Sequence, residues 1–341
     1  MFYTLILSSF LIAFCLTYGV KQYALKKGIQ NAPDERSSHE GVIPHGGGFA
    51  ITVAYIFAII VGYFLGYFDQ DVILTIVLCG GIISMVGFFD DHKPMSVSVR
   101  IAIQFACAIV AIWLLEGFPK ISYGWFILDW GIYGYIIGVF ALVWLTNLYN
   151  FMDGIDGFAS IEAMTTTGCM ALILLINSKF ESVWQLNILL VASVLGFFFW
   201  NFPKAKIFMG DVGSYFLGFV MGVLMIKSWY LTIDIIFSWV ILLTVFITDA
   251  TYTLVVRIVR GERFYLPHRS HAYQIISRKY DSHIKVSTML IFINIGYLFP
   301  IAFLVATKDI HPLTGLAITY IPMILLAAFV KAGIPERKVS D

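Results

Sequence analysis

The chain has 341 residues, of which 60% are hydrophobic and only 13% are charged, and its formal net charge is +1. Soluble domains carry about 25% charged residues, so this composition excludes an ordinary soluble fold and predicts a protein that lies mostly in lipid. The net charge itself says nothing about partners, because in membrane proteins the distribution of Lys and Arg between loops is what matters.

The expected membrane spans follow from the apolar runs, since a helix needs about 20 mostly apolar residues to cross a bilayer. Such runs recur along the whole chain. We therefore predict an all-α integral membrane protein, a single polytopic membrane domain over residues 1–341 with about eleven transmembrane helices. The runs cover residues 2–20, 47–68, 72–89, 98–115, 132–149, 158–176, 186–202, 212–229, 234–256, 286–306 and 312–331.

The first of these runs has no basic leader and no small-residue cleavage site, which favours a retained span over a signal peptide. The cysteines also lie inside apolar runs, without the paired spacing of metal ligands. We expect them to pack in the membrane core and to form neither disulfides nor a zinc site. They are Cys15, Cys79, Cys107 and Cys169.

Most of the 22 lysines and arginines lie in alternate loops between the expected spans. The most basic of these loops is residues 257–285, and the short tail at 332–341 belongs to the same side. The positive-inside rule places them in the cytoplasm, with the N-terminus outside and the C-terminus inside. A basic loop beside a membrane commonly meets anionic lipid headgroups, and it is also suited to clamp a diphosphate.

The turn between the fifth and sixth expected spans carries a cluster of acids and amides, namely Asn147, Asn150, Asp153 and Asp156. Ionisable groups at membrane depth are costly, so such a cluster indicates a functional site. Asp153 and Asp156 would share one face if the turn were helical. The alternative is a solvated acidic loop, since Asp is common beside helix ends.

Two further acidic clusters lie on the same predicted side. Asp90 and Asp91 end the third span, and Asp211 begins the eighth in a Gly-rich stretch whose free N–H groups would favour phosphate. Converging carboxylates would repel one another without a cation, and Mg²⁺ typically takes one or two carboxylates together with substrate phosphates. No Cys or His spacing suits a softer metal. Separate helix-end acids that face water are the alternative.

The stretch from His45 to Gly48 precedes the second span. A glycine run at a helix start could form a phosphate-binding nest, but on the sequence alone we favour a flexible loop. Asp249 lies about two turns inside the ninth span, where an unpaired charge would be expensive. We expect Asp249 to pair with a basic residue or to reach the cytoplasmic cavity.

Taken together and in this order, the motifs resemble the polyprenyl-phosphate N-acetylhexosamine-1-phosphate transferases of glycosyltransferase family 4. That family includes the enzymes that start O-antigen synthesis, and the resemblance covers nearly the whole chain. It rests on Arg36, His39, Pro44 and Gly47-Gly48, on Asp90-Asp91, on Asn147, Asn150 and Asp153-Gly154-Ile155-Asp156-Gly157, on Trp200-Asn201-Phe202-Pro203 and Phe208-Met209-Gly210-Asp211, and on the loop around His271.

The resemblance implies a cytoplasmic-face active site that transfers a HexNAc-1-phosphate from a UDP-sugar to undecaprenyl phosphate and releases UMP. The implied partners are UDP-HexNAc, undecaprenyl phosphate and membrane lipids, with no nucleic acid, and a homodimer stays open. The implied location is the bacterial inner (plasma) membrane. The implied cofactor is Mg²⁺, with Mn²⁺ as an alternative.

The resemblance also implies roles for individual residues. Asp90 matches the acid proposed to deprotonate the lipid phosphate, and Asp91 is its neighbour in the dyad. Asp211 matches the Mg²⁺-binding acid, and we expect Asp156 to be the second metal ligand. The nucleotide and sugar are expected at Asn147, Asn150, Asp153 and Asn201, and the phosphates at Arg36, His39, Lys93, Arg100, Arg269 and His271.

The basic loop departs from the family pattern, because Tyr273 and Gln274 stand where many members have histidines. We therefore expect Arg269 and His271, and not a cluster of several histidines, to bind the phosphates. The sequence of this loop resembles the branch of the family that handles 6-deoxy N-acetyl sugars (FucNAc/QuiNAc type), so GlcNAc and a 6-deoxy HexNAc are both candidate sugars. Two other classes stay open: a cation- or proton-coupled membrane transporter and a non-catalytic lipid-binding scaffold. Transporter sites gather near the midplane, often between internal repeats, whereas these acids cluster at one face.

Overall fold

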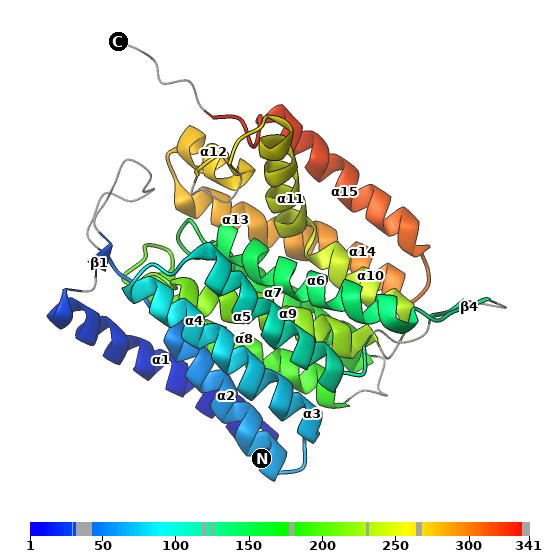
Figure 1. Ribbon diagram of the computed structural model, residues 1–341, viewed down its shortest axis with the longest axis horizontal. Helices are drawn as coiled ribbons and strands as arrows, with labels where there is room; N and C mark the ends of the chain where they lie inside the picture. The colour runs from blue at the N-terminus through cyan, green and yellow to red at the C-terminus, as the bar shows by residue number, and fades with distance from the viewer. Residues whose placement is uncertain are drawn as a thin grey trace.

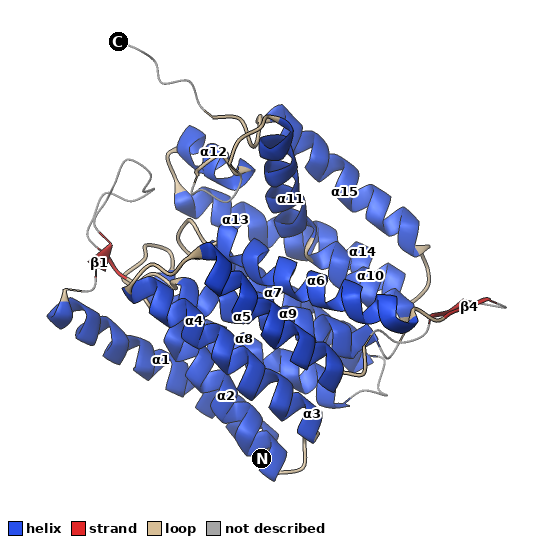
Figure 2. Cartoon of the chain, in the orientation of Figure 1, coloured by secondary structure: helices blue, strands red, loops and turns tan. Residues whose placement is uncertain are grey.

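The computed structural model describes residues 1–28, 30–31, 43–117, 121–123, 126–176, 181–229, 232–263 and 268–335. These residues are mainly helical, with two short antiparallel hairpins, β1–β2 and β3–β4 (Figures 1 and 2). The elements are α1 Phe2–Lys27, β1 Gln30–Asn31, β2 Ile43–Pro44, α2 Gly48–Phe64, α3 Gln70–Ile73, the π-helix η1 Leu74–Gly80, α4 Gly81–His92, α5 Val97–Leu114, β3 Ile121–Tyr123, β4 Phe126–Leu128, α6 Gly131–Phe151, α7 Phe158–Ile176, α8 Glu181–Asn201, α9 Asp211–Trp229, α10 Ile233–Leu242, α11 Thr244–Val259, α12 Ala272–Tyr280, α13 His283–Ile293, the π-helix η2 Asn294–Leu298, α14 Phe299–Ala306 and α15 Pro312–Phe329.

The prediction of an all-α integral membrane protein is confirmed. Nine helical segments within the described residues are long and apolar enough to cross a membrane, and α10 with α11 forms a tenth candidate that is bent by 69°. The remaining expected span corresponds to α2, which is apolar but has only 17 residues. The sequence-based number of about eleven therefore counts a short helix and a broken one as full spans. Within the basic loop 257–285, Ala272–Tyr280 form the helix α12.

Helix α9 lies at the centre of the bundle, packed against α4 on one side and α6 on the other (Figure 1). Its most apolar window is 89% buried, which is typical of a helix that is hydrophobic on all faces. Its neighbours approach closely because glycines lie at the crossings. A Cβ on Gly87 of α4 would lie 2.3 Å from the carbonyl oxygen of Asp211, and one on Gly218 of α9 would lie 2.5 Å from that of Leu145 in α6.

We expect Gly87→Ala to destabilise the protein and to reduce its activity. The added methyl group must push α4 away from the backbone of Asp211, and overpacking of this kind costs about 1–3 kcal/mol. The control is Gly81→Ala on the same helix, where the nearest atom to the new Cβ is a side-chain carbon of Ile56 at 3.7 Å. Thermal unfolding in detergent should separate the two variants. Equal melting temperatures would show that the α4–α9 crossing tolerates a side chain.

The segment from Pro44 to Gly48 is bound along its backbone to the segment that precedes α9. Phe208 N donates to Pro44 O (2.8 Å), and Gly47 N donates to Phe208 O (2.9 Å). A Cβ on Gly48 would lie 2.3 Å from Gly213 Cα, so only glycine fits this contact. Our interpretation of this stretch as a flexible loop was wrong, because backbone pairing with a distant segment leaves no signal in local sequence.

Candidate active site

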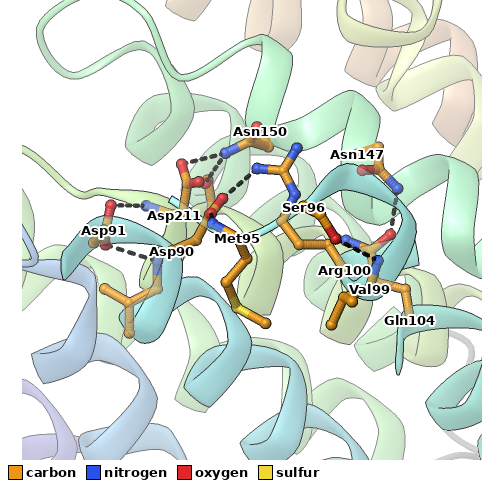
Figure 3. A network of polar contacts seen from close by, with 12 residues as sticks. Asp90, Asp91, Met95, Ser96, Val99, Arg100, Gln104, Asn147, Asn150 and Asp211 are labelled. Carbon is orange, nitrogen blue, oxygen red and sulfur yellow. Dashed lines mark hydrogen bonds and ion pairs between the residues drawn. The ribbon is translucent and has the colours of Figure 1, made fainter. Parts of the chain in front are cut away.

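The last turn of α4 meets the first turn of α9 through Asp91. Its Oδ1 accepts a hydrogen bond from Asp211 N (3.0 Å) and its Oδ2 accepts one from Val212 N (3.2 Å) (Figure 3). The first N–H groups of a helix have no partner within that helix, so Asp91 caps α9 from another helix. This contact joins residues 120 positions apart in the sequence and confirms that the second and third acidic clusters converge.

The last turn of α6 completes the same cluster. Asn150 Nδ2 donates to Asp211 Oδ1 (2.8 Å) and to Ser214 Oγ (2.9 Å), as Figure 3 shows for Asp211. Three helix ends, those of α4, α6 and α9, therefore present carboxylate and carboxamide groups to one place.

Arg100 reaches the cluster from α5. Its guanidinium forms an ion pair with Asp90 Oδ2, and Asp90 Oδ1 accepts a hydrogen bond from Met95 N (2.7 Å) (Figure 3). The structure thus places the predicted basic residue Arg100 directly on a predicted catalytic acid. Lys93 is exposed just beyond the end of α4, and it forms no ion pair with a described residue.

His45 was not among the predicted site residues, yet its Nδ1 lies 3.7 Å from Asp91 Oδ1. It comes from the segment that pairs with residues before α9, so its position follows from that pairing. The glycines after His45 were the only sequence signal that could have indicated a close approach.

Asp153 lies in the turn between α6 and α7 and is half-buried. Burial and the negative charge of Asp91 together raise the pKa of Asp153 to about 7. Asp153 therefore belongs to the same electrostatic cluster as Asp91. With Arg100 paired to Asp90, the structure shows no Lys or Arg ion pair to Asp91, Asp153 or Asp211 among the described residues.

Asp156 has different partners. Its Oδ2 accepts a hydrogen bond from Ala205 N (3.1 Å), and its Oδ1 lies 3.4 Å from His283 Nδ1 at the start of α13. Among the described residues no hydrogen bond or ion pair joins Asp156 to Asp211. The turn is not helical, since α6 ends at Phe151 and α7 begins at Phe158, so the spacing of three does not place Asp153 and Asp156 on one helical face.

The remaining amides predicted to bind nucleotide or sugar are engaged by the protein itself. Asn147 Nδ2 donates to Gln104 Oε1 (2.6 Å) and to Val143 O (2.8 Å). Asn201 is buried, accepts a hydrogen bond from Gly157 N (3.0 Å) and donates one to Ile207 O (3.1 Å). Asn201 thus holds the turn before α7 against the segment that leads into α9.

The predicted phosphate-binding loop is anchored by Asp249 of α11. Asp249 accepts hydrogen bonds from His271 Nδ1 (3.2 Å), Ala272 N (2.8 Å) and Tyr273 N (2.9 Å), which confirms that it pairs with a basic residue. His271 is only 3% exposed, and the ring of His268 stacks on it with centroids 4.9 Å apart. Burial, with His271 and Arg257 nearby, lowers the pKa of His268 to about 3, so this ring is neutral.

The two residues that depart from the family pattern lie between α12 and the acidic turn, and Tyr273 is only 3% exposed. Tyr273 Oη donates to Phe151 O (3.1 Å) and lies 2.1 Å from the position of a Cβ on Gly154. Gln274 Oε1 accepts a hydrogen bond from His271 N (3.3 Å). Arg269 is exposed. Arg36 and His39 lie outside the described residues.

The oxygen-rich donor set suits a hard divalent cation. Within the described part of the chain, no three His, Cys, Asp or Glu residues form a preassembled metal site. Mg²⁺ does not need one, because it commonly binds through one or two carboxylates plus substrate phosphates. Asp91, Asp153 and Asp211 offer such oxygens, and the charge of Asp91 contributes, after burial, to the raised pKa of Asp153.

The fold and the site define a class of protein: a polytopic membrane enzyme whose polar groups gather where its helices end. Residues 73–229 match the family model of glycosyl transferase family 4. A probable undecaprenyl-phosphate N-acetylglucosaminyl 1-phosphate transferase of Bacillus subtilis (strain 168) is 31% identical over 304 residues, which cover 87% of this chain and 82% of that protein. The chain therefore belongs to glycosyl transferase family 4, and it is a phosphotransferase.

More distant relatives agree. The undecaprenyl-phosphate alpha-N-acetylglucosaminyl 1-phosphate transferase of Escherichia coli (strain K12) is 25% identical over 290 residues, covering 80% of this chain and 76% of that protein. The protein of the same name from Yersinia pestis is 25% identical over 284 residues, with coverage of 79% and 75%. The resemblance that we inferred from the motifs is confirmed.

Proposed function

We propose that the protein transfers a HexNAc-1-phosphate from a UDP-sugar to undecaprenyl phosphate, releases UMP, and so initiates a lipid-linked glycan of the O-antigen type. The names of its relatives support this reaction. The observation that carries the proposal is the meeting of Asp90, Asp91 and Asp211 with Arg100 and Asn150 at three helix ends. Two anionic reactants must approach each other in this reaction, so positive groups and a cation are needed to screen them.

In the proposed reaction an oxygen of the lipid phosphate attacks the phosphorus that bears the sugar, and the bond to the UMP oxygen breaks. We favour direct attack over an aspartyl-phosphate intermediate. Asp90 takes any remaining proton from the lipid phosphate, whose second pKa near 6 demands little driving force. Arg100 first exchanges Asp90 for a phosphate group, which frees the carboxylate, because Arg binds phosphate as readily as carboxylate.

Asp211, with Asp91 and Asp153 beside it, would hold Mg²⁺ in this proposal, and Mn²⁺ has the same ligand preference. The cation would screen the phosphate oxygens and stabilise negative charge on the leaving UMP. Asp156 remains our predicted second ligand, although its described partners are Ala205 and His283. The site would open to the cytoplasm in the bacterial inner membrane, with the N-terminus outside and the C-terminus inside.

The reaction is tested by release of UMP in membranes that contain the protein, undecaprenyl phosphate and Mg²⁺. The assay should be run across a panel of UDP-sugars, including UDP-GlcNAc and its 6-deoxy relatives, because Tyr273 and Gln274 leave the sugar open. We expect UMP release by the wild type with at least one sugar and none by Asp90→Asn. If neither protein releases UMP with any sugar, the proposal fails, and a coupled transporter becomes the better explanation of the buried acids.

We also expect the acid limb of the pH profile to depend on Mg²⁺. Asp153 has a pKa of about 7 beside Asp91, so at low Mg²⁺ protonation near neutral pH competes with cation binding. A bound cation favours the ionised carboxylate, so a higher Mg²⁺ concentration should shift the acid limb to lower pH. The measurement is kcat/KM for UMP release against pH at two Mg²⁺ concentrations. Asp153→Asn, which cannot titrate, should lose this shift; the same shift in the variant would exclude Asp153 as its origin.

A further inference from the structure

A carboxyl group lies inside the helix bundle away from the proposed active site. Glu162 belongs to α7, within the candidate span Phe158–Ile176, and its exposed fraction is 0%. Among the described residues no ion pair includes Glu162. A charged carboxylate without a cationic partner is expensive in a membrane interior, so this group requires an explanation.

Its main partner is Asn294, which is also 0% exposed. Asn294 begins the π-helix η2, which interrupts the span made by α13 and α14, and π-helical turns are frequent at functional sites. Asn294 Nδ2 donates to Glu162 Oε2 (2.6 Å) and to Thr165 Oγ1 (2.8 Å). These two bonds use both N–H groups of the amide.

Two buried oxygens are left without a donor. Glu162 Oε1 and Asn294 Oδ1 accept no hydrogen bond from any described residue. The hydroxyl of Thr165 cannot donate to either oxygen, because it already donates to Ile161 O (2.7 Å). The Thr166 hydroxyl lies near the Glu162 carboxyl, but it could serve only one of the two oxygens and would leave the negative charge in place.

We propose that Glu162 is a proton-binding site inside the membrane. The carboxylic acid donates its Oε1–H to Asn294 Oδ1, while the amide donates to Oε2, so the two side chains form a neutral acid–amide pair. One proton satisfies both orphan oxygens and removes the charge. The inference does not depend on the proposed reaction.

The surroundings favour a proton over a metal ion. Among the described residues, the ionisable groups that interact electrostatically with Glu162 are Tyr149 of α6, Tyr320 of α15 and Cys169 of its own helix, and none of them is cationic. Hard metal ions bind through six or more oxygens in typical sites, whereas the described residues offer at most three unpartnered oxygens here, Glu162 Oε1, Asn294 Oδ1 and Thr166 Oγ1.

The pair also bears on the active site, since it fastens α7 to the helix that continues from α13. Near its start α13 carries Ser287, whose Oγ donates to Asp156 O (2.7 Å), and His283, which lies beside the Asp156 carboxylate. The neutral pair thus holds in place the helix that positions Asp156.

Infrared spectroscopy tests the proposal on the full chain in lipid nanodiscs. With ¹³C-labelled glutamate, the wild type should show the carbonyl band of a protonated glutamic acid at neutral pH, and Glu162→Gln should lack it. Absence of that band in the wild type would overturn the proposal, whether or not the variant folds.

Thermal unfolding gives the second readout. Glu162→Gln presents an amide N–H where the acid presents O–H, so its melting temperature should equal that of the wild type. Glu162→Asp should melt several degrees lower, because its shorter side chain cannot reach Asn294. A Gln variant as unstable as the Asp variant would contradict a neutral pair. Replacing Na⁺ by choline should change nothing; a wild-type melting temperature that falls without Na⁺, with no fall in Glu162→Gln, would show that the occupant is a monovalent cation.

Discussion

Asp211→Asn should reduce UMP release by about 10³-fold, which corresponds to about 4 kcal/mol of transition-state stabilisation. The substitution preserves size and still accepts a hydrogen bond from Asn150, so the start of α9 should stay in place. It removes the charge that would hold a divalent cation against the substrate phosphates. The measurement is initial UMP release over a Mg²⁺ titration, and the residual activity should need more Mg²⁺ than the wild type does.

The matched control is Asp71→Asn, which breaks the ion pair between Asp71 and Lys227 near the other end of α9. Lys227 lies sixteen residues beyond Asp211, or about 24 Å along the helix axis. This variant loses a carboxylate that contacts the same helix, but far from the cluster, and should keep both its rate and its Mg²⁺ dependence. An unchanged Mg²⁺ titration in Asp211→Asn would remove Asp211 from the metal site.

The sequence was sufficient to predict that distant acids converge, and the reason is topological. Spans that alternate in direction bring every second loop to one face, so the charge distribution placed Asp90, Asp91 and Asp211 on the same side. The direct contact of Asp91 with the first N–H groups of α9 could not be predicted. This contact requires that α4 and α9 cross closely. The close crossing is possible because Gly87 has no side chain where it meets the backbone of Asp211, which lies far along the chain.

Local spacing was less reliable than topology. The interval of three between Asp153 and Asp156 predicts a shared face only in a helix, and the structure has a turn there that sends Asp156 toward Ala205 and His283. His271 was expected at the phosphates, yet it is buried because Asp249 binds its ring. Glu162 was missed because a single charge in a long apolar run does not change the prediction of a span.

Asp249→Ala is expected to have the second large effect, on stability as well as activity. Asp249 accepts hydrogen bonds from Thr253, His271 and the backbone N–H groups of Ala272 and Tyr273. Removing it leaves buried donors at the start of α12 without partners, which should cost about 3–5 kcal/mol. With α12 released from α11, the contact of Tyr273 with Phe151 beside the acidic turn is lost as well. The measurements are the melting temperature, the rate of limited proteolysis near α12 and UMP release.

Asp281→Asn is the control, because it changes an exposed acid at the other end of α12 whose left-handed backbone, with φ of 46°, suits Asn. Its melting temperature and its rate of UMP release should equal those of the wild type. Asp249→Asn keeps one carbonyl oxygen that can accept from the two backbone N–H groups. Its melting temperature should therefore lie between those of the wild type and Asp249→Ala. If Asp249→Ala melts at the same temperature as Asp281→Asn, the four hydrogen bonds do not hold α12, and the burial of His271 must have another cause. If instead it melts lower but releases UMP at the wild-type rate, α12 contributes to the fold and not to the reaction.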